Sequence, residues 1–555
     1  MATPTGRRVI GVDFDNTIAS YDHLMHAMAL ERGLIGAAIP KNKKAVRDAI
    51  RARPDGESDW RYLQVTAYGP RMHEARPMAG VKEFLAECCR RNIPVYVVSH
   101  KTEYANFGKA HVNLRTVAMD WLDQHGFLAL EHLGLEPSRV FFESTRAEKL
   151  KRIEALGVTH FVDDLEETFL DDAFPPAVQQ ILLTDGQPSV GMGAVPSWTW
   201  WQVQVQLLGG PERTALAALL QKPVRSVAHI GNGGNSRVYR VSCEDESCYA
   251  AKCYCQRTMD GLDRLDVEFS SLQFLWEHGA RCTPRPIAVD HDRQIAAYEY
   301  VDGTAIDMCA VSDSDVEQVV SFLRRLKEIA MSDAADRLPR ASEACFSSRA
   351  LRENLKGRLD RLEAVPGEDP SYASLRRFLS EELGPALEET VERTKARTGE
   401  AEWNAELPRS AWTLSPSDIG FHNALRRPNG SIVFLDFEYF GWDDPAKMIA
   451  DFILHPAMDL TESVKRRYVE RTLECFGGDR SLPQRLARLY PLFGLKWSLI
   501  LLNEFVPSFL ARREFAADAD TDREQVRVKQ LARAQRMLAR TMSELDRFPY
   551  LTGRA

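Results

Sequence analysis

Between residue 7 and about residue 190, short apolar runs alternate with helix-like segments. RVIGVDF, IPVYVVS, RVFFE, HFVDD and QQILLTD are predicted to be strands, and VKEFLAECCRR and AEKLKRIEALG are predicted to be helices between them. This alternation is typical of an α/β fold with a parallel sheet covered on both faces. Such folds place their chemistry at the carboxyl ends of the strands, where this chain has Asp13, Ser99 and Asp163–Asp164.

A polar, helix-like segment interrupts this alternation just after the first strand. We interpret it as a small helical cap, at about residues 20–77, inserted into a domain of residues 1–190. Residues 191–222 are predicted to be a linker. Its tryptophans, which we expect to pack between domains rather than to form an aromatic ligand platform, are Trp198, Trp200 and Trp201.

A different pattern begins near Arg225. The short strands VAHIG, RVYRVSC, CYAAKCY and IAAYEYV surround the helix DVEFSSLQFLWEHG, whereas the chain after Val301 is mostly helical. We therefore predict a bilobal α+β domain, with a smaller lobe at 223–300 and a helical lobe at 301–555.

Composition limits the partners and the location that we expect. The net charge of −8 over 555 residues argues against a nucleic-acid surface. The most apolar stretch, Leu489 to Leu510, contains Lys496, Asn503 and Glu504, so we predict a buried helix and no membrane partner. The start MATPTGRR has no apolar signal segment, so we expect a cytoplasmic protein with reduced thiols.

The segment DFDNT places Asp13 and Asp15 on a loop that leaves the first strand. Two carboxylates at this spacing are able to converge on one point, and Mg²⁺ prefers oxygen ligands. A carboxylate also attacks phosphorus to form an aspartyl phosphate. A second carboxyl group then protonates the leaving alcohol and activates water.

Four motifs in order resemble those of the haloacid dehalogenase superfamily: DFDNT, VVSHKTE, EKLKRI and FVDDLEE. The resemblance implies a phosphomonoesterase. The residues that it implies are Asp13 as nucleophile, Asp15 as acid and base, Thr17 and Ser99 for phosphate binding, Lys149 as partner of the phosphate charge, and Asp13, Asp15, Asp163 and Asp164 for Mg²⁺. Lys151 competes with Lys149, which we prefer because it falls in the first turn of its helix. Two alternatives remain open: acidic residues that only cap a helix, and the same fold without activity.

The segment HIGNGGNSRVYRV contains three glycines between two strands, where backbone N–H groups can close over phosphates. No Gly-Lys-Ser/Thr sequence follows it. Lys252 lies on the next strand, and Glu268 on the following helix is a suitable ion-pair partner. In kinases such a lysine grips the ATP phosphates and the glutamate steadies the lysine.

SPSDIGFHNALRRPNGSIVFLDFEYFGWDDP resembles the catalytic segment of the aminoglycoside phosphotransferase and choline kinase-like superfamily. The resemblance implies ATP and Mg²⁺ as cofactors and YEYV as the hinge that holds adenine. The implied residues are Asp418 as catalytic base, Asn423, Asp436 and Glu438 for Mg²⁺, and Gly231, Gly233, Gly234, Lys252, Glu268, Glu299 and Val301 for ATP. Pro416-Ser417 replaces the family's usual His-Gly before the base, which puts the loop geometry in question.

These two motif sets predict a bifunctional kinase and phosphatase acting on small molecules. The kinase would phosphorylate a hydroxyl of a sugar, polyol or amino alcohol. The alternatives are a kinase with a non-catalytic phosphatase-like domain, a kinase domain without activity, and an antibiotic-inactivating phosphotransferase. A protein kinase is disfavoured because no DFG or APE-like sequence follows. Neither the substrates nor the oligomeric state can be inferred.

Overall fold

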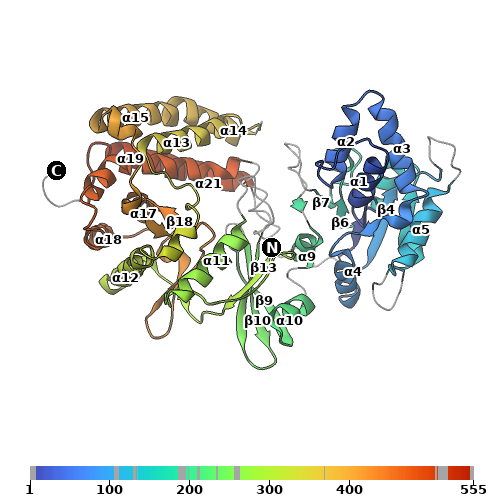
Figure 1. Ribbon diagram of the computed structural model, residues 1–555, viewed down its shortest axis with the longest axis horizontal. Coiled ribbons are helices and arrows are strands. Elements are labelled where there is room, and N and C mark those ends of the chain that lie inside the picture. Colours follow the sequence, from blue (N-terminus) through green and yellow to red (C-terminus); the bar gives the residue numbers. More distant parts are fainter. Residues whose placement is uncertain are drawn as a thin grey trace. The chain divides into compact units, whose positions relative to one another are not determined.

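The computed structural model describes residues 8–104, 112–128, 133, 135–184, 195–197, 199–208, 210, 213–232, 236–254, 263–367, 369–506, 509 and 523–550. The chain forms two compact units, Met1–Glu212 and Arg213–Ala555, which Figure 1 shows in blue to green and in green to red. Each unit has its own sheet and its own core.

The first unit is built on a six-stranded parallel sheet with the order β5-β4-β1-β6-β7-β8. The five strands expected from the apolar runs are all present. The strands are β1 (Ile10–Val12), β4 (Val95–His100), β5 (Val140–Glu143), β6 (His160–Asp163), β7 (Gln179–Leu183) and β8 (Val195–Ser197). Val12 of the central strand pairs with Val97 and with Val162, so the carboxyl ends of β1, β4 and β6 lie side by side.

Helices cover both faces of this sheet. Val97 and Val162 face one apolar cluster, while their neighbours Val98 and Phe161 face another, as the two-residue period of a strand requires. The first face is covered by α4 (Val81–Arg90), α5 (Leu114–Gln124) and α9 (Trp200–Leu208), and the second by α7 (Arg146–Ala155) and α8 (Glu166–Phe169). A capping box of Thr145 and Glu148 fixes the start of α7.

The insert after the first strand begins and ends at one short antiparallel pair. β2 (Ala19–Ser20) pairs with β3 (Arg76–Pro77). Between them lie α1 (Asp22–Glu31), α2 (Lys43–Arg51), α3 (Gly56–Tyr68) and the 3₁₀ turn η1 (Met72–Glu74). Because β2 follows the DFDNT loop directly, the insert is anchored beside that loop.

The segment 191–222, predicted to be a linker, contributes to both units within its described part. β8 extends the first sheet, and α9 packs on α4 through Trp200, whose ring lies 4.9 Å from that of Phe84. α10 (Arg213–Leu220) lies in the second unit, against β9 and β12. The division between the units therefore falls between Glu212 and Arg213.

The smaller lobe of the second unit is a five-stranded antiparallel sheet with the order β12-β13-β11-β10-β9. Its strands are β9 (Val224–Asn232), β10 (Ser236–Cys243), β11 (Cys248–Tyr254), β12 (Pro286–Asp290) and β13 (Ile295–Glu299). The helix α11 (Arg264–Glu277) packs against β12 and β13. Lys252 lies on the central strand, opposite Val238 and Ala296.

The rest of the second unit is mainly helical. Its helices are α12 (Asp313–Ile329), α13 (Ser348–Glu363), α14 (Pro370–Phe378), the π-helical turn η5 (Leu379–Leu383), α15 (Gly384–Thr398), α16 (Glu400–Asn404), α17 (Pro445–Leu454), α18 (Glu462–Cys475), α19 (Leu482–Leu501) and α21 (Arg523–Ser543). Short 3₁₀ turns occur at η3 (Met308–Ala310), η4 (Asp333–Arg337), η6 (Arg409–Ala411), η7 (Phe421–Asn423) and η8 (Leu502–Phe505). Short strands are β14 (Thr304–Ala305), β15 (Thr413–Ser415), β16 (Ala424–Arg426), β17 (Ile432–Phe434) and β18 (Gly441–Asp443).

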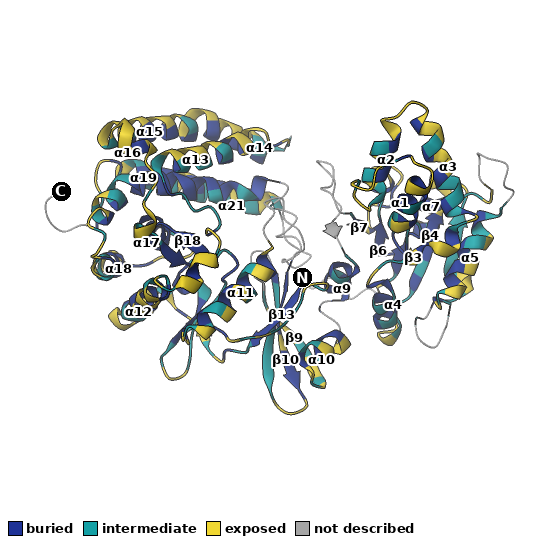
Figure 2. Ribbon diagram, viewed as in Figure 1, coloured by how far each residue is buried: buried dark blue, intermediate teal, exposed yellow. Residues whose placement is uncertain are grey.

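Leu489 to Leu501 of the most apolar stretch lie in α19, which belongs to the core and contacts α17 and α21. Figure 2 shows α17 and the inner sides of these helices as buried, with exposed positions on α15. Lys496 of α19 is itself 3% exposed. Within the described part of the chain, no helix has both the length and the apolar composition needed to cross a membrane.

Candidate active sites

The first site lies where β1 and β6 end. Lys149, in the first turn of α7, donates hydrogen bonds to Asp13 Oδ1 and to Asp163 Oδ2, both at 2.6 Å. All three side chains are buried, whereas Lys151 is exposed. The structure thus brings Asp13, Lys149 and Asp163 together and leaves Lys151 outside.

Three carboxylates of this site lie close enough to share a cation. Asp13, Asp163 and Asp164 each offer an oxygen within 4.8 Å of the others. Burial raises the pKa of Asp13 to about 7; Lys149 opposes this shift, and Asp163 and Asp15 add to it. Burial likewise raises the pKa of Asp164, as does the neighbouring Asp163. A hard divalent cation such as Mg²⁺ fits this all-oxygen set and would relieve the crowding of charge.

Asp15 is held by two side chains that the sequence analysis did not identify. Lys101 Nζ lies 3.0 Å from Asp15 Oδ1 and 2.9 Å from Oδ2, and Tyr21 Oη donates to Oδ1 at 2.6 Å. Lys101 follows Ser99 by two residues, the same spacing as between Asp13 and Asp15. This spacing could have identified Lys101 from the sequence, because side chains at positions i and i+2 of a strand point to the same side.

The two predicted phosphate ligands are buried beside these carboxylates. Ser99 lies on β4 and Thr17 on the loop after β1, and they are 1% and 0% exposed. The Thr17 hydroxyl has no hydrogen-bond partner among the described residues, while the Thr17 carbonyl accepts a 2.8 Å bond from Trp200 Nε1. A buried hydroxyl without a partner is costly, so this group fits a phosphate oxygen as its acceptor.

In the second unit, Lys252 is the centre of a buried ion cluster. Its Nζ lies 2.6 Å from Glu268 Oε2, 2.7 Å from Asp436 Oδ1 and 3.9 Å from Glu438 Oε2. Burial alone would lower the pKa of Lys252, but the three carboxylates outweigh burial and raise it. Tyr254 Oη also donates to Glu268 Oε2 at 2.7 Å. Lys252 is therefore a buried cation on the central strand of the smaller lobe.

Glu268, Asp436 and Glu438 form a second all-oxygen group. Each offers a carboxylate oxygen within 4.8 Å of the others. Burial and the nearby Asp436 raise the pKa of Glu438 to about 7, with Lys252 opposing. This donor set also suits Mg²⁺. Glu268 was expected as the partner of Lys252 and as an ATP-binding residue, and no separate signal in the sequence indicates its place in this carboxylate group.

Asn423, predicted to bind Mg²⁺, is hydrogen-bonded to Asp418. Its Nδ2 donates to the Asp418 carbonyl at 3.1 Å and to Oδ2 at 3.2 Å. The hairpin of β16 and β17 still aligns Asn423 with the metal segment, because Leu435 N donates to Asn423 O at 2.8 Å. Asp436, the next residue, adopts a left-handed backbone with φ of 66°.

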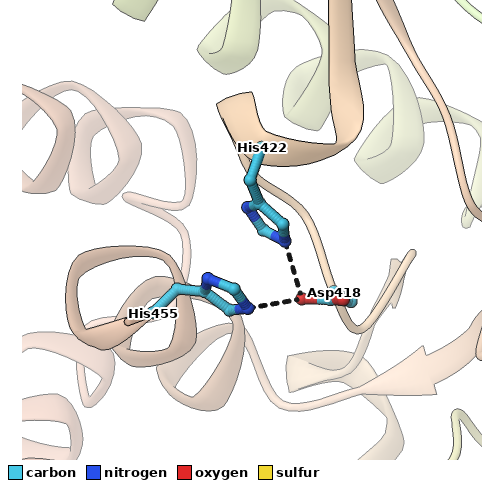
Figure 3. Close-up of side chains that lie close together, drawn as sticks. All are labelled: Asp418, His422 and His455. Atoms are coloured by element: carbon cyan, nitrogen blue, oxygen red, sulfur yellow. Dashed lines mark hydrogen bonds and ion pairs between the residues drawn. The ribbon is translucent and has the colours of Figure 1, made fainter. Parts of the chain in front are cut away.

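Two histidines face Asp418 (Figure 3). His422 Nε2 and His455 Nε2 lie 3.3 Å and 3.4 Å from Asp418 Oδ1, and the two rings stack at 3.7 Å with 11° between their planes. Burial would raise the pKa of Asp418, but the hydrogen bond from His422 and the interactions with His455 and His422 lower it to about 2. Burial lowers the pKa of His455 to about 4, so at pH 7 hydrogen bonding rather than a charge on His455 favours the carboxylate.

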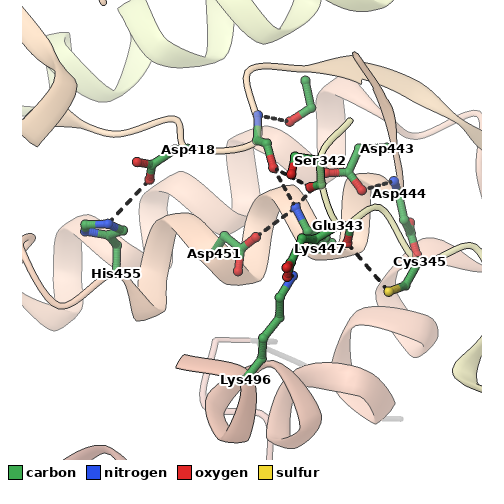
Figure 4. Close-up of polar contacts among 12 residues, drawn as sticks. Ser342, Glu343, Cys345, Asp418, Asp443, Asp444, Lys447, Asp451, His455 and Lys496 are labelled. Atoms are coloured by element: carbon green, nitrogen blue, oxygen red, sulfur yellow. Dashed lines mark hydrogen bonds and ion pairs between the residues drawn. The ribbon is translucent and has the colours of Figure 1, made fainter. Parts of the chain in front are cut away.

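The Pro416-Ser417 replacement leaves the loop before Asp418 well held. Ser417 has φ of 66°, and its backbone N–H donates to Ser415 Oγ at 2.9 Å. Lys447 Nζ donates to Ser417 Oγ at 3.1 Å and to Asp443 Oδ2 at 2.7 Å (Figure 4). A buried lysine on α17 thus supports the loop.

The remaining residues predicted to bind ATP lie outside the cluster around Lys252. Glu299 ends β13 and accepts a 2.6 Å bond from Arg427, and Val301 is buried just beyond it. Gly231 lies on β9 opposite Val238. Gly233 and Gly234 lie outside the described residues.

The second unit therefore combines an antiparallel lobe, a lysine–glutamate pair and an acidic loop on a helical lobe. Residues 226–486 match the family described as "Phosphotransferase enzyme family" (APH). The match identifies residues 226–486 as an APH phosphotransferase domain.

Three solved structures illustrate what the chain is similar to. Spectinomycin phosphotransferase APH(9)-Ia, in complex with ADP and spectinomycin, is 15% identical over 60% of this chain and 97% of that chain, with a TM-score of 0.43. An ethanolamine kinase from Plasmodium vivax is 15% identical over 56% and 81%, with a TM-score of 0.40. Choline kinase LicA from Streptococcus pneumoniae is 17% identical over 59% and 97%, with a TM-score of 0.39. A search of curated proteins found no match.

Proposed function

We propose that the second unit transfers the terminal phosphate of ATP to a hydroxyl of a sugar, polyol or amino alcohol. The observation that carries this proposal is the buried Lys252, held between Glu268 and Asp436 in a domain that matches the phosphotransferase family. A lysine so placed binds the nucleotide phosphates, and the adjacent carboxylates suit the Mg²⁺ that accompanies ATP.

Asp418 is the proposed base for the acceptor hydroxyl. Its lowered pKa keeps it ionised at pH 7, and its carboxylate is oriented by Asn423 and His422. As the acceptor oxygen bonds to phosphorus, Asp418 receives the hydroxyl proton and ADP leaves. Lys252 offsets the negative charge that develops on the transferring phosphate.

We propose phosphomonoester hydrolysis for the first unit, supported by the geometry of its site and by the resemblance to haloacid dehalogenases. Asp13 attacks phosphorus, and the ester oxygen leaves with a proton from Asp15. Thr17 and Ser99 donate to the phosphate oxygens, and Lys149 offsets their charge. Asp15 then takes a proton from water, which cleaves the aspartyl phosphate and releases Asp13.

The kinase proposal is tested by ADP release in a library of hydroxyl compounds with Mg·ATP, followed by mass spectrometry of the phosphorylated product. We expect a product with the full chain and none with Asp436→Asn. ADP release that no acceptor stimulates, or a product that persists in Asp436→Asn, would contradict the assignment.

The phosphatase proposal is tested by incubating the chain with phosphomonoesters and Mg²⁺ and quenching in acid. We expect mass spectrometry to find a phosphoryl group on the peptide that contains Asp13, and no such group in Asp13→Asn. Silence across a broad panel would favour the alternative of a first unit that binds a ligand without hydrolysing it.

A further inference from the structure

The helical insert between β2 and β3 places aromatic side chains beside Asp15. Its three helices, α1, α2 and α3, pack on one another and lie together at one end of the first unit (Figure 1). Tyr21, the residue before α1, donates to Asp15 Oδ1 at 2.6 Å. Tyr68, the last residue of α3, packs edge-on against the Tyr21 ring at 4.6 Å. The insert therefore covers Asp15, the proposed proton donor to the ester oxygen.

Lys43, the first residue of α2, is a cation of the insert that lies beside this site. Its backbone N–H donates to Asp22 Oδ1 at 2.7 Å, and its Nζ lies 5.9 Å from the centre of the Tyr68 ring. Burial would lower the pKa of Lys43, but Tyr68 and Asp164 raise it. Within the described part of the chain, Lys43 nevertheless forms no direct ion pair with a carboxylate. Its charge is therefore available to a ligand that lies under the insert.

A second ammonium group lies at the same tyrosine ring. Lys101 Nζ is 5.3 Å from the centre of the Tyr68 ring and 2.9 Å from Asp15 Oδ2. Both lysines are thus within about 6 Å of one ring, the range in which an aromatic face attracts a cation. Two cations gather around the carboxyl group that is proposed to protonate the leaving oxygen.

The leaving group of the ester must lie on this side of the site. In the proposed hydrolysis phosphorus faces Asp13, and the ester oxygen takes its proton from Asp15. The carbon bonded to that oxygen therefore lies beyond Asp15, toward the insert, where Lys43 and Lys101 lie. A negative charge on this part of the substrate would meet two positive charges of the protein.

We propose that the first unit hydrolyses phosphomonoesters whose leaving group carries a second anion, either a carboxylate or another phosphate, and that Lys43 and Lys101 bind this anion. The inference rests on the phosphatase function proposed above and names the class of substrate for that site. A hydrogen bond from a lysine to such an anion is stronger than one between neutral groups. Lys43 thus selects the substrate and takes no part in the attack on phosphorus.

Selectivity is tested with three esters that differ at one position. They are glycerol phosphate with a terminal phosphate, phosphoglycerate, in which a carboxylate replaces the other terminal hydroxymethyl group, and glycerol bisphosphate, in which both terminal oxygens carry phosphate. Binding to the full Asp13→Asn chain, which cannot form the aspartyl phosphate, is measured by calorimetry in excess Mg²⁺. We expect phosphoglycerate or glycerol bisphosphate to bind at least about ten times more tightly than glycerol phosphate, because it gains a charge-assisted hydrogen bond. The ester that binds more tightly identifies the anion as carboxylate or phosphate.

Variants of α2 in the same Asp13→Asn background assign the preference to Lys43. We expect Lys43→Met to lower the preference at least about fivefold and Lys43→Arg to retain it, because arginine keeps the charge. Lys44→Met, which changes the exposed lysine at the next position of α2, is the matched control and should bind like the parent. Circular dichroism checks that each variant is folded.

Two results would overturn the proposal: equal affinities for the three esters, or a preference that survives in folded Lys43→Met. Hydrolysis of the same esters is then measured with Asp13 intact. A preference that Lys43→Met removes, in a chain that hydrolyses none of the esters, would leave the anion site standing and count against the phosphatase function instead.

Discussion

Replacing Lys252 by methionine should destabilise the second unit and abolish ATP-dependent transfer. Methionine keeps most of the side chain's length and removes its charge. Glu268 and Glu438, which are 4% and 2% exposed, then lose the cation that lies 2.6 Å and 3.9 Å from them. Removing one partner of a buried ion pair leaves an uncompensated buried charge, which costs about 3–5 kcal/mol.

We expect the lower end of this range, about 3 kcal/mol, for two structural reasons. The Asp436 side chain is 27% exposed, so water partly solvates its charge. The pKa of Glu438 is raised by burial to about 7, so this group can accept a proton near neutral pH. Added Mg²⁺ should reduce the loss, because the ion would supply positive charge to the same carboxylates.

The assay is hydrogen exchange of the full chain followed by mass spectrometry, because one unfolding curve cannot assign a loss to one of two units. Amides of β11 and α11 should exchange about 100-fold faster in Lys252→Met, since 1.4 kcal/mol corresponds to a factor of ten. The matched control is Lys222→Met, which removes an exposed ion pair with Asp245 and should change nothing measurable. Equal exchange in the two variants, or a loss that Mg²⁺ leaves unchanged, would refute the reasoning.

Two further predictions concern other charged groups. Burial would raise the pKa of Glu343, but Lys496 and Arg358 lower this pKa to about 2, below the ordinary value of 4.5. The contribution of Glu343 to stability is therefore present above pH 4.5 and is lost as the pH falls toward 2. The shift corresponds to at most about 3 kcal/mol, and we expect about 2 kcal/mol because the side chain is 31% exposed. The free energy of opening of the second unit, measured by hydrogen exchange at several pH values, should therefore fall more steeply with acid in the wild type than in Glu343→Gln. Parallel profiles would contradict this. Lys101→Met should slow phosphate release at least about tenfold, because Asp15 loses its ion pair with Lys101, and it should leave ATP-dependent transfer unchanged. An unchanged rate of phosphate release would exclude a role for Lys101.

The strand-end residues of the first unit could be placed from the sequence because parallel strands share one edge. Register alone brings Asp13 and Asp163 together, and the helical turn selects Lys149 over Lys151. The short strand β12 was not predicted, since PIAVD is brief and begins with proline. Segment 191–222 resembled a linker because its contributions to both units depend on tertiary packing rather than on a local pattern.

The side chains that surround Asp418 could not be predicted from the sequence, mainly because they depend on contacts between distant residues. His455 follows α17, 37 residues after Asp418, and no motif marks it. His422 lies inside the motif, but its approach to Asp418 depends on the loop geometry. Asn423 was assigned to Mg²⁺ by resemblance, and the motif did not indicate the hydrogen bond from its Nδ2 to Asp418.

The central claim is that this chain holds two separate phosphate-transferring sites, and one paired assay tests it most directly. ATP-dependent transfer to a hydroxyl acceptor and phosphate release from a phosphomonoester would be measured side by side in Asp13→Asn and Asp418→Asn. We predict that Asp13→Asn loses release and keeps transfer, and that Asp418→Asn loses transfer and keeps release. Loss of both activities in either folded variant would contradict the account.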